Sequence, residues 1–244
     1  MNHLPRVYVI YGITGSGRRS IIGDLIADGI EQNREVLCFL PENEPAISDI
    51  DSAIGQSAST TVLQWSLNKA KVMHGPIQAN PEVIFFLSPG DSDPADTAEA
   101  VKSWAEHNRC EVTRLITVVH CSFLRKSPEA KAWYNACIHF SDVVLMNRRE
   151  PGDNKWVRQF EEHFKKQHCP SRFLPVKNDR VANPAEILCP ETRRESLYFD
   201  ELTPIEEDAF EEDLPEDRKP DKYIERLESG LRAHPIPSIK KWIV

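Results

Sequence analysis

The chain has 244 residues, and its 40% hydrophobic content is enough for the core of one large domain. Its 38 acidic and 30 basic residues give a formal net charge of -8, which excludes an overall basic footprint for nucleic acid. No stretch approaches the roughly 20 apolar residues of a membrane span, and the apolar run near the N-terminus is too short for a signal peptide. We therefore expect a cytoplasmic protein that binds neither nucleic acid nor membrane.

Apolar runs alternate with helical patterns along most of the chain. Strands are predicted at Arg6 to Tyr11 and at 34–41, 82–88, 114–120, 142–147 and 172–176. Helices are predicted at 17–33, 60–74, 93–108, 127–139 and 152–168. Because the apolar runs lack a period of two and are followed by helices, they indicate an α/β fold: a mostly parallel sheet of about six strands with helices on both faces.

The C-terminal part differs in composition from the rest. Residues 200–217 hold ten acidic residues and no Lys or Arg, so the remainder of the chain is close to neutral. With two prolines and little that could pack, this stretch predicts an acidic linker or flexible arm over 199–220. Residues 221–234 fit one apolar helix face, and 235–244 end in an apolar tip that looks exposed. We expect three parts: a domain over 1–198, the arm over 199–220, and a C-terminal helix with its tip over 221–244.

The six cysteines are widely scattered and form no C-x-x-C pair: Cys38, Cys110, Cys121, Cys137, Cys169 and Cys189. No histidine lies at zinc-finger spacing from them. Three of the cysteines lie in or beside apolar runs, which favours buried free thiols over disulfides or metal ligands. We therefore predict no structural metal.

The stretch YGITGSGRRS (11–20) lies between the first predicted strand and the first predicted helix. Its glycines have the spacing of the phosphate loop G-x-x-x-x-G-K-[ST], whose backbone N–H groups surround phosphates. Arg18 stands where that pattern has Lys, and Arg19 where it has Ser or Thr. The predicted phosphate-binding residues are Gly12, Thr14, Gly15, Ser16, Gly17, Arg18, Arg19 and Ser20.

Two interpretations of this loop are open from its residues. The glycines could form only a tight connection, with Arg18 and Arg19 solvated at the start of the helix. Alternatively, the two arginines could hold an anion, because cations at a helix N-terminus are unfavourable without one. A guanidinium cannot bind a metal cation, so Mg²⁺ is not expected to be required.

With its strand, GITGSGRRS resembles the GFLGSGKTT-like loop of the CobW-type metallochaperone GTPases, relatives of the urease- and hydrogenase-maturation GTPases. Three further segments follow in the order of that family. PENEP (41–45) resembles its ENEFG switch segment, and SPGDSDP (88–94) its E-C-T-G-x-x-D-P segment. FSDVVLMNRRE (140–150) resembles the strand that ends in the guanine-recognition motif.

The resemblance covers residues 6–176 and implies a P-loop NTPase fold that binds GTP or GDP. It assigns base binding to Asn147, Arg148 and Glu150. It assigns switch-like positions to Glu42, Asn43, Glu44, Gly90, Asp91 and Asp93.

This sequence departs from the family pattern at the positions that bind metal, water and guanine. Leu87 replaces the Glu that helps to hold metal and water, and the C-x-C-C metal motif is absent. Arg148 and Glu150 replace the Lys and Asp of the guanine motif, and the acidic arm stands where the family has a C-terminal domain. We therefore expect no catalytic and no metal-binding residues, and a degenerate GTPase with weak or no hydrolysis.

Three hypotheses about function follow. The favoured one is a CobW-like P-loop protein that binds a nucleotide, guanine nucleotide above all, or another phosphate ligand. A second is a non-catalytic interaction protein that binds a protein partner through the acidic arm and the C-terminal tip. The third is an active GTP-dependent metal chaperone.

Overall fold

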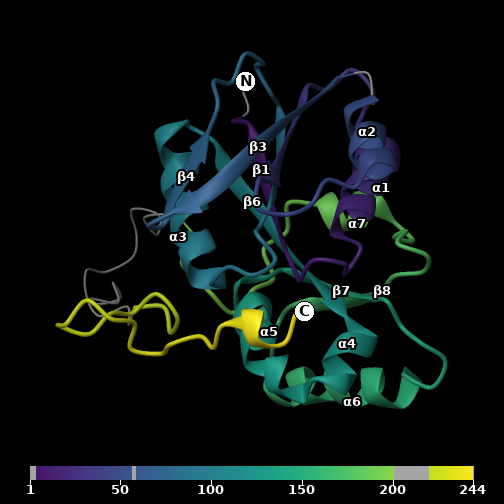
Figure 1. The fold of residues 1–244 in the computed structure, drawn as a ribbon, viewed down its shortest axis with the longest axis vertical. Coiled ribbons are helices and arrows are strands. Elements are labelled where there is room, and N and C mark those ends of the chain that lie inside the picture. The colour runs from purple at the N-terminus through teal and green to yellow at the C-terminus, as the bar shows by residue number, and fades with distance from the viewer. Residues whose placement is uncertain (1–3, 57–58, 201–219, 244) are drawn as a thin grey trace, which may run out of the picture.

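The computed structural model describes residues 4–56, 59–200 and 220–243. A single sheet runs through the described part of the chain (Figure 1). Its strand order is β4-β3-β2-β5-β1-β6-β7-β8. All neighbouring strands are parallel except β3 and β4, which form an antiparallel pair at one edge. The predicted α/β fold with a mostly parallel sheet is confirmed, although the sheet has eight strands and not about six.

The strands are β1 (Arg6–Tyr11), β2 (Val36–Pro41), β3 (Thr60–Asn68), β4 (Lys71–His74), β5 (Val83–Leu87), β6 (Glu111–His120), β7 (Val143–Asn147) and β8 (Arg172–Pro175). The α-helices are α1 (Arg18–Gly29), α2 (Ser48–Gln56), α3 (Pro94–His107), α4 (Cys121–Lys126), α5 (Lys131–Phe140), α6 (Asn154–Lys166) and α7 (Pro184–Leu188). Two short 3-10 helices, η1 (Pro128–Ala130) and η3 (Ile239–Lys241), complete the described elements.

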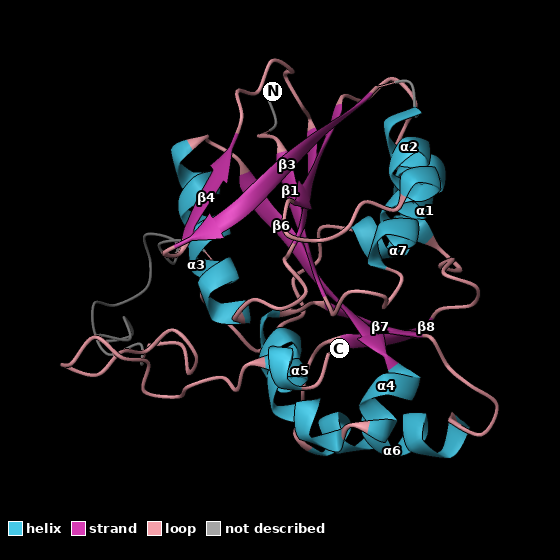
Figure 2. Ribbon diagram, in the orientation of Figure 1, coloured by secondary structure: helices cyan, strands magenta, loops and turns pink. Residues whose placement is uncertain are grey.

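Helices cover both faces of the sheet, as Figure 2 shows. Successive residues of β1 point to opposite faces: Val7 and Val9 belong to one buried cluster, Tyr8 and Ile10 to another. The first cluster is completed by α3, α5 and α6, and the second by α1, α2 and α7. Burial on both faces explains why the central strands are continuous apolar runs in the sequence.

The predicted helix over 60–74 is wrong, because this stretch forms the edge strands β3 and β4. Leu63, Trp65 and Leu67 alternate along β3 and pack on one face, so the period is that of a strand. Trp65 is fully buried and donates a hydrogen bond from its indole to the carbonyl of Leu87, 3.0 Å away. A tight turn at 69–70, where both residues have positive φ, reverses the chain into β4.

The short helices α2 and α7 were not predicted. Each packs against α1 on the same face of the sheet. Helices this short depend on tertiary packing for their stability, so their local sequence gives a weak signal. The predicted helix over 17–33 is also shorter than expected, since α1 ends at Gly29. None of the helices in the described ranges is long and apolar enough to cross a membrane.

The C-terminal segment 220–243 differs from its prediction. Residues 221–234 form turns and an isolated bridge between Arg226 and Arg232, and not a helix. The tip is only partly exposed: Ile239 is fully buried in the first cluster, and Ile236 and Trp242 are partly buried against that cluster. The acidic arm lies almost entirely outside the described residues, so the three-part division stays a prediction.

The six cysteines are free thiols, as predicted. Cys38, Cys121 and Cys137 are buried in the core. Burial raises the pKa of Cys38 and of Cys121 to about 12, so these thiols stay protonated and serve as small apolar groups.

Candidate functional site

The sheet brings the four predicted motifs to one edge. β1 lies between β5 and β6, and β2, β5 and β7 run parallel to their neighbours, so their carboxyl ends meet on the same side. The phosphate loop follows β1, the segment of Glu44 follows β2, the turn of Gly90 follows β5, and Asn147 ends β7. In open α/β sheets, ligands bind in a crevice outside these carboxyl ends.

The loop after β1 has the backbone of a glycine-dependent turn. Gly17 caps α1 with φ +92°, a left-handed conformation that L side chains rarely adopt. A Cβ on Gly17 would also lie only 2.4 Å from Nδ2 of Asn147 and 2.5 Å from Oδ1 of Asp179. The glycine therefore allows β7 and the loop after β8 to approach the phosphate loop closely.

A cleft of about 200 Å³ opens at this loop. Its walls come from the loop, from the start of α1, and from the segments around Glu44 and α2: Thr14, Gly15, Gly17, Arg18, Arg19, Ser20, Glu44, Pro45, Ile47, Ile50 and Arg148. Ligand pockets are commonly about 300–1,000 Å³, so the cleft is small. A cleft of this size would enclose only the phosphate part of a nucleotide.

Arg18 is buried and makes two hydrogen bonds across the site. Its Nη1 donates to the carbonyl of Ser88 at 2.5 Å, and its Nη2 donates to Oε1 of Glu44 at 2.7 Å. The backbone N–H of Gly90 donates to the same Glu44 oxygen, also at 2.7 Å. The side chains of Arg18 and Glu44 are only 3% and 7% exposed, so this is a buried ion pair.

Arg19 is held in a similar way. Its guanidinium donates to Oδ2 of Asp51 on α2 and lies 3.8 Å from Oε2 of Glu44. Asp51 also accepts a hydrogen bond from the backbone of Ile47. The interpretation of Arg18 and Arg19 as solvated side chains is therefore wrong, since both are buried. Each has an anion, but that anion is a carboxylate of the same chain.

Only part of the predicted base-binding set meets the loop. Asn147 donates from Nδ2 to the carbonyl of Ser16 at 2.7 Å and to Oδ1 of Asp179 at 2.8 Å. Arg148 donates to the other carboxylate oxygen of Asp179 at 2.8 Å. Glu150 lies elsewhere, because it pairs with Lys126 at 2.9 Å and with Arg125 at 3.5 Å.

The six switch-like residues divide into two groups. Glu44 and Gly90 reach the phosphate loop, as described above. The other four do not line the cleft. The side chain of Asn43 donates to Asp91, which also pairs with Lys240 of η3 at 3.0 Å. Asp93 caps the start of α3 by accepting from the backbone of Ala95, and Glu42 is exposed.

Two acidic residues of the site, Asp51 and Asp179, are not predicted from the sequence. Asp51 is the partner of Arg19, and its position in the first turn of α2 was the only available signal. Asp179 joins Asn147 and Arg148, and it follows the last parallel strand, whose carboxyl end lies at the same edge as the cleft. Neither residue belongs to a motif of recognisable spacing.

The loop fits a phosphate group but not a magnesium ion. Thr14 and Gly15 are exposed and border the cleft beside the start of α1, where backbone N–H groups suit an anion. At the position where a hydroxyl would hold Mg²⁺, the guanidinium of Arg19 occupies the cleft instead. The described residues also contain no group of three or more His, Cys, Asp or Glu side chains that could hold a metal ion.

Similarity to known proteins is detected through structure. No family model matches this sequence, and no curated protein matches it. The hydrogenase maturation factor HypB from Archaeoglobus fulgidus superposes with a TM-score of 0.50, at 11% identity, over 70% of this chain and 81% of its own. The fold is that of a P-loop NTPase. This agrees with the resemblance to the CobW-type GTPases at the level of the fold.

A Zn(II)-bound YjiA GTPase from E. coli has a TM-score of 0.45 at 8% identity, over 79% of this chain and 67% of its own. The fold assignment does not depend on this looser superposition.

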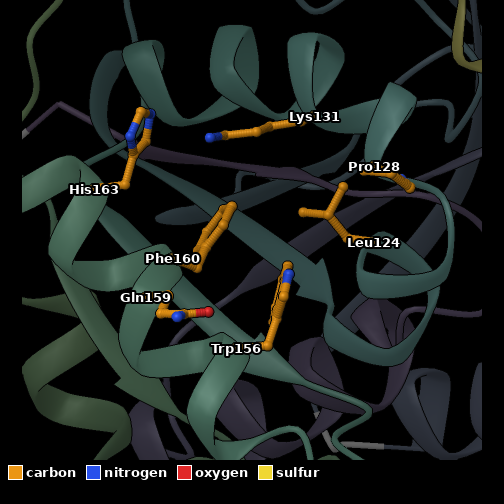
Figure 3. A pocket seen from close by; sticks show the side chains of 7 residues that line it. All are labelled: Leu124, Pro128, Lys131, Trp156, Gln159, Phe160 and His163. Carbon is orange, nitrogen blue, oxygen red and sulfur yellow. The ribbon is translucent and has the colours of Figure 1, made fainter.

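A second hollow, of about 290 Å³, shares no lining residue with the cleft at the phosphate loop. Figure 3 shows the side chains that line it. It is formed by α4, η1, α5 and α6, and the rings of Trp156 and Phe160 stack at its wall with centroids 5.1 Å apart. None of the predicted site residues lines it.

Proposed function

We propose that this P-loop protein binds a nucleotide or another phosphate ligand at residues 12–20 and hydrolyses it slowly or not at all. The observation that carries the proposal is the pairing of Arg19 with Asp51 in a loop that otherwise keeps its glycine backbone. The glycines support binding, and the arginine opposes the metal chemistry on which hydrolysis depends.

Support for binding comes from the loop and its surroundings. Gly15 and Gly17 line the cleft at the N-terminus of α1, where backbone N–H groups and the helix dipole favour an anion. A Cβ on Gly15 would meet nothing within 4 Å, so the loop backbone is accessible there.

Support for slow or absent hydrolysis comes from two positions. Phosphoryl transfer needs a cation to offset charge on the transferred group and a polar residue to orient water. The guanidinium of Arg19 stands at the metal position of the motif and is already neutralised by Asp51. Leu87, where the family has Glu, is fully buried in the second core cluster and offers no polar side-chain group.

The predicted base-binding residues support little selectivity between guanine and adenine. Guanine recognition by Glu150 would require its carboxylate to leave Lys126 and Arg125. The proposal therefore places most of the binding energy at the phosphates. We expect GDP and ADP to bind with affinities within about threefold of each other, which is under 1 kcal/mol.

Isothermal titration with GTP, GDP, ATP and sulfate, combined with a phosphate-release assay, tests this function. We expect binding of at least one ligand and no Mg²⁺-dependent release. Gly17→Ala should abolish binding, whereas Gly152→Ala, at another glycine with positive φ but away from the cleft, should not. Absence of binding by every ligand would overturn the proposal, and rapid Mg²⁺-dependent release would favour an active chaperone GTPase instead.

A further inference from the structure

Glu44 is the point where the phosphate loop meets the turn after β5. One oxygen of its carboxylate accepts from the guanidinium of Arg18 and from the backbone N–H of Gly90, each at 2.7 Å. The second oxygen lies 3.8 Å from the guanidinium of Arg19. Three positively polarised groups of the site therefore surround a single anionic side chain.

The donors around Glu44 are those suited to a terminal phosphate. In a P-loop, the side chain at the position of Arg18 reaches the β- and γ-phosphates. A cation and a backbone N–H that converge on one oxygen form charge-assisted hydrogen bonds, which suit phosphate and carboxylate oxygens alike. The turn of Gly90 packs closely on the phosphate loop, because a Cβ on Gly90 would lie 2.6 Å from the backbone N of Thr14 and 2.8 Å from Nη2 of Arg18. The hydrogen bond from Gly90 joins the segment of Glu44 to the same wall.

We propose that the Glu44 carboxylate holds the place of a terminal phosphate, so that the ligand of this cleft is a nucleoside diphosphate or a shorter phosphate ester. This inference rests on the proposed function, since it names the class of ligand for the same site. Gly15 and Gly17 also line the cleft and remain available for the inner phosphates.

Charge balance favours the shorter ligand. The three arginines that line the cleft, Arg18, Arg19 and Arg148, are matched by Glu44, Asp51 and Asp179. A third phosphate would either lie against the Glu44 carboxylate, where like charges repel, or force Glu44 out of its buried pair with Arg18. A diphosphate avoids both costs because it does not need the position of Glu44.

The test is isothermal titration of GMP, GDP and a non-hydrolysable GTP analogue against the unmodified protein and Glu44→Gln. Glutamine keeps an acceptor for Gly90 but removes the negative charge. We expect the unmodified protein to bind GDP at least about tenfold more tightly than the triphosphate analogue, and Glu44→Gln to reduce this difference to about threefold by gaining triphosphate affinity. Glu31→Gln, at a side chain 73% exposed at the far end of α1, should leave the preference unchanged.

Equal binding of GDP and the triphosphate analogue by the unmodified protein would overturn the inference while leaving the proposed function standing. An unchanged preference in a folded Glu44→Gln would overturn it as well. If GMP, GDP and the triphosphate analogue all fail to bind either protein, and ATP and sulfate also fail to bind the unmodified protein, the proposed function itself fails. Even if Glu44→Gln does not fold, the comparison of GDP with the triphosphate analogue on the unmodified protein tests the inference.

Discussion

Arg19 at the start of α1 donates a hydrogen bond to Asp51 on α2, so the second arginine of the phosphate loop is neutralised from within the chain. Both side chains are largely buried, at 7% and 18% exposure. The contact ties the loop to a helix that the sequence pattern does not predict. The paired guanidinium of Arg19 also lies where the Ser or Thr hydroxyl of a P-loop would hold Mg²⁺.

Nucleotide binding should be independent of magnesium. Because the guanidinium of Arg19, paired with Asp51, already fills the place of the ion, Mg²⁺ should contribute little to binding. We expect the affinity for GDP to change by less than about threefold when Mg²⁺ is replaced by EDTA, as measured by titration calorimetry. The double variant Arg18→Lys with Arg19→Thr should acquire a magnesium requirement. Binding by the unmodified protein only in the presence of Mg²⁺ would show that another group holds the ion.

Gly17→Ala should destabilise the protein by about 2–4 kcal/mol, because strained backbone and overpacking add. The new Cβ would collide with Asn147 and Asp179 in a conformation with φ +92°. Gly152→Ala has a similar φ of +99° but meets nothing within 4 Å, so it should cost only about 1 kcal/mol. Urea unfolding compares the two. Equal losses would mean that Gly17 is needed for its φ alone.

His139 should make stability depend on pH. One ring nitrogen lies 3.0 Å from a carboxylate oxygen of Glu195, and the other lies 2.8 Å from one of Asp221. Asp221 is at the start of the C-terminal segment, so this contact attaches the segment to α5. Burial acts to lower the pKa of His139, but the hydrogen bonds with these two carboxylates outweigh it, and the pKa is raised above 6.5. The stabilisation from protonated His139 is therefore fully present below pH 6.5 and is lost as the pH rises through the raised pKa.

Glu195 and Asp221 set the lower limit of the pH range in which protonated His139 stabilises the protein. The hydrogen bond with His139 lowers the pKa of Glu195. Burial acts to raise the pKa of Asp221, but His139 outweighs it and the pKa is lowered. Their contribution is lost as the pH falls through these lowered values. Thermal unfolding of His139→Gln should thus differ most from the unmodified protein between about pH 5 and pH 6.5, and less at pH 9. A difference that grows toward pH 9 would contradict the ion-pair assignment.

Ile239→Ala should test the packing of the C-terminal tip. Ile239 is fully buried against the first core cluster, so its truncation should cost about 2–4 kcal/mol in chemical unfolding. Leu231→Ala removes a side chain that is 69% exposed and should cost under about 0.5 kcal/mol. Equal effects of the two substitutions would mean that the tip is not held on the core in solution.

The sequence by itself determined the central layers of the fold and the position of the phosphate loop. The buried run from Val7 to Tyr11, the glycines after it, and the apolar face of α1 are signals carried by neighbouring residues. Such local patterns fix a strand, a turn or a helix without information from the rest of the chain. Local patterns also predict α3 and α6, but they do not identify β3, where an apolar alternation lies within an otherwise polar stretch.

Only the tertiary structure decided what the arginines of the loop contact. Glu44 is 26 residues from Arg18 and 46 from Gly90, and Asp51 is 32 from Arg19. The parallel sheet brings their segments to one edge, and burial then requires each guanidinium to have a partner. A pattern of neighbouring residues carries no information about contacts over such separations. The loop motif could thus be recognised in the sequence, whereas its neutralisation by Glu44 and Asp51 follows from the fold.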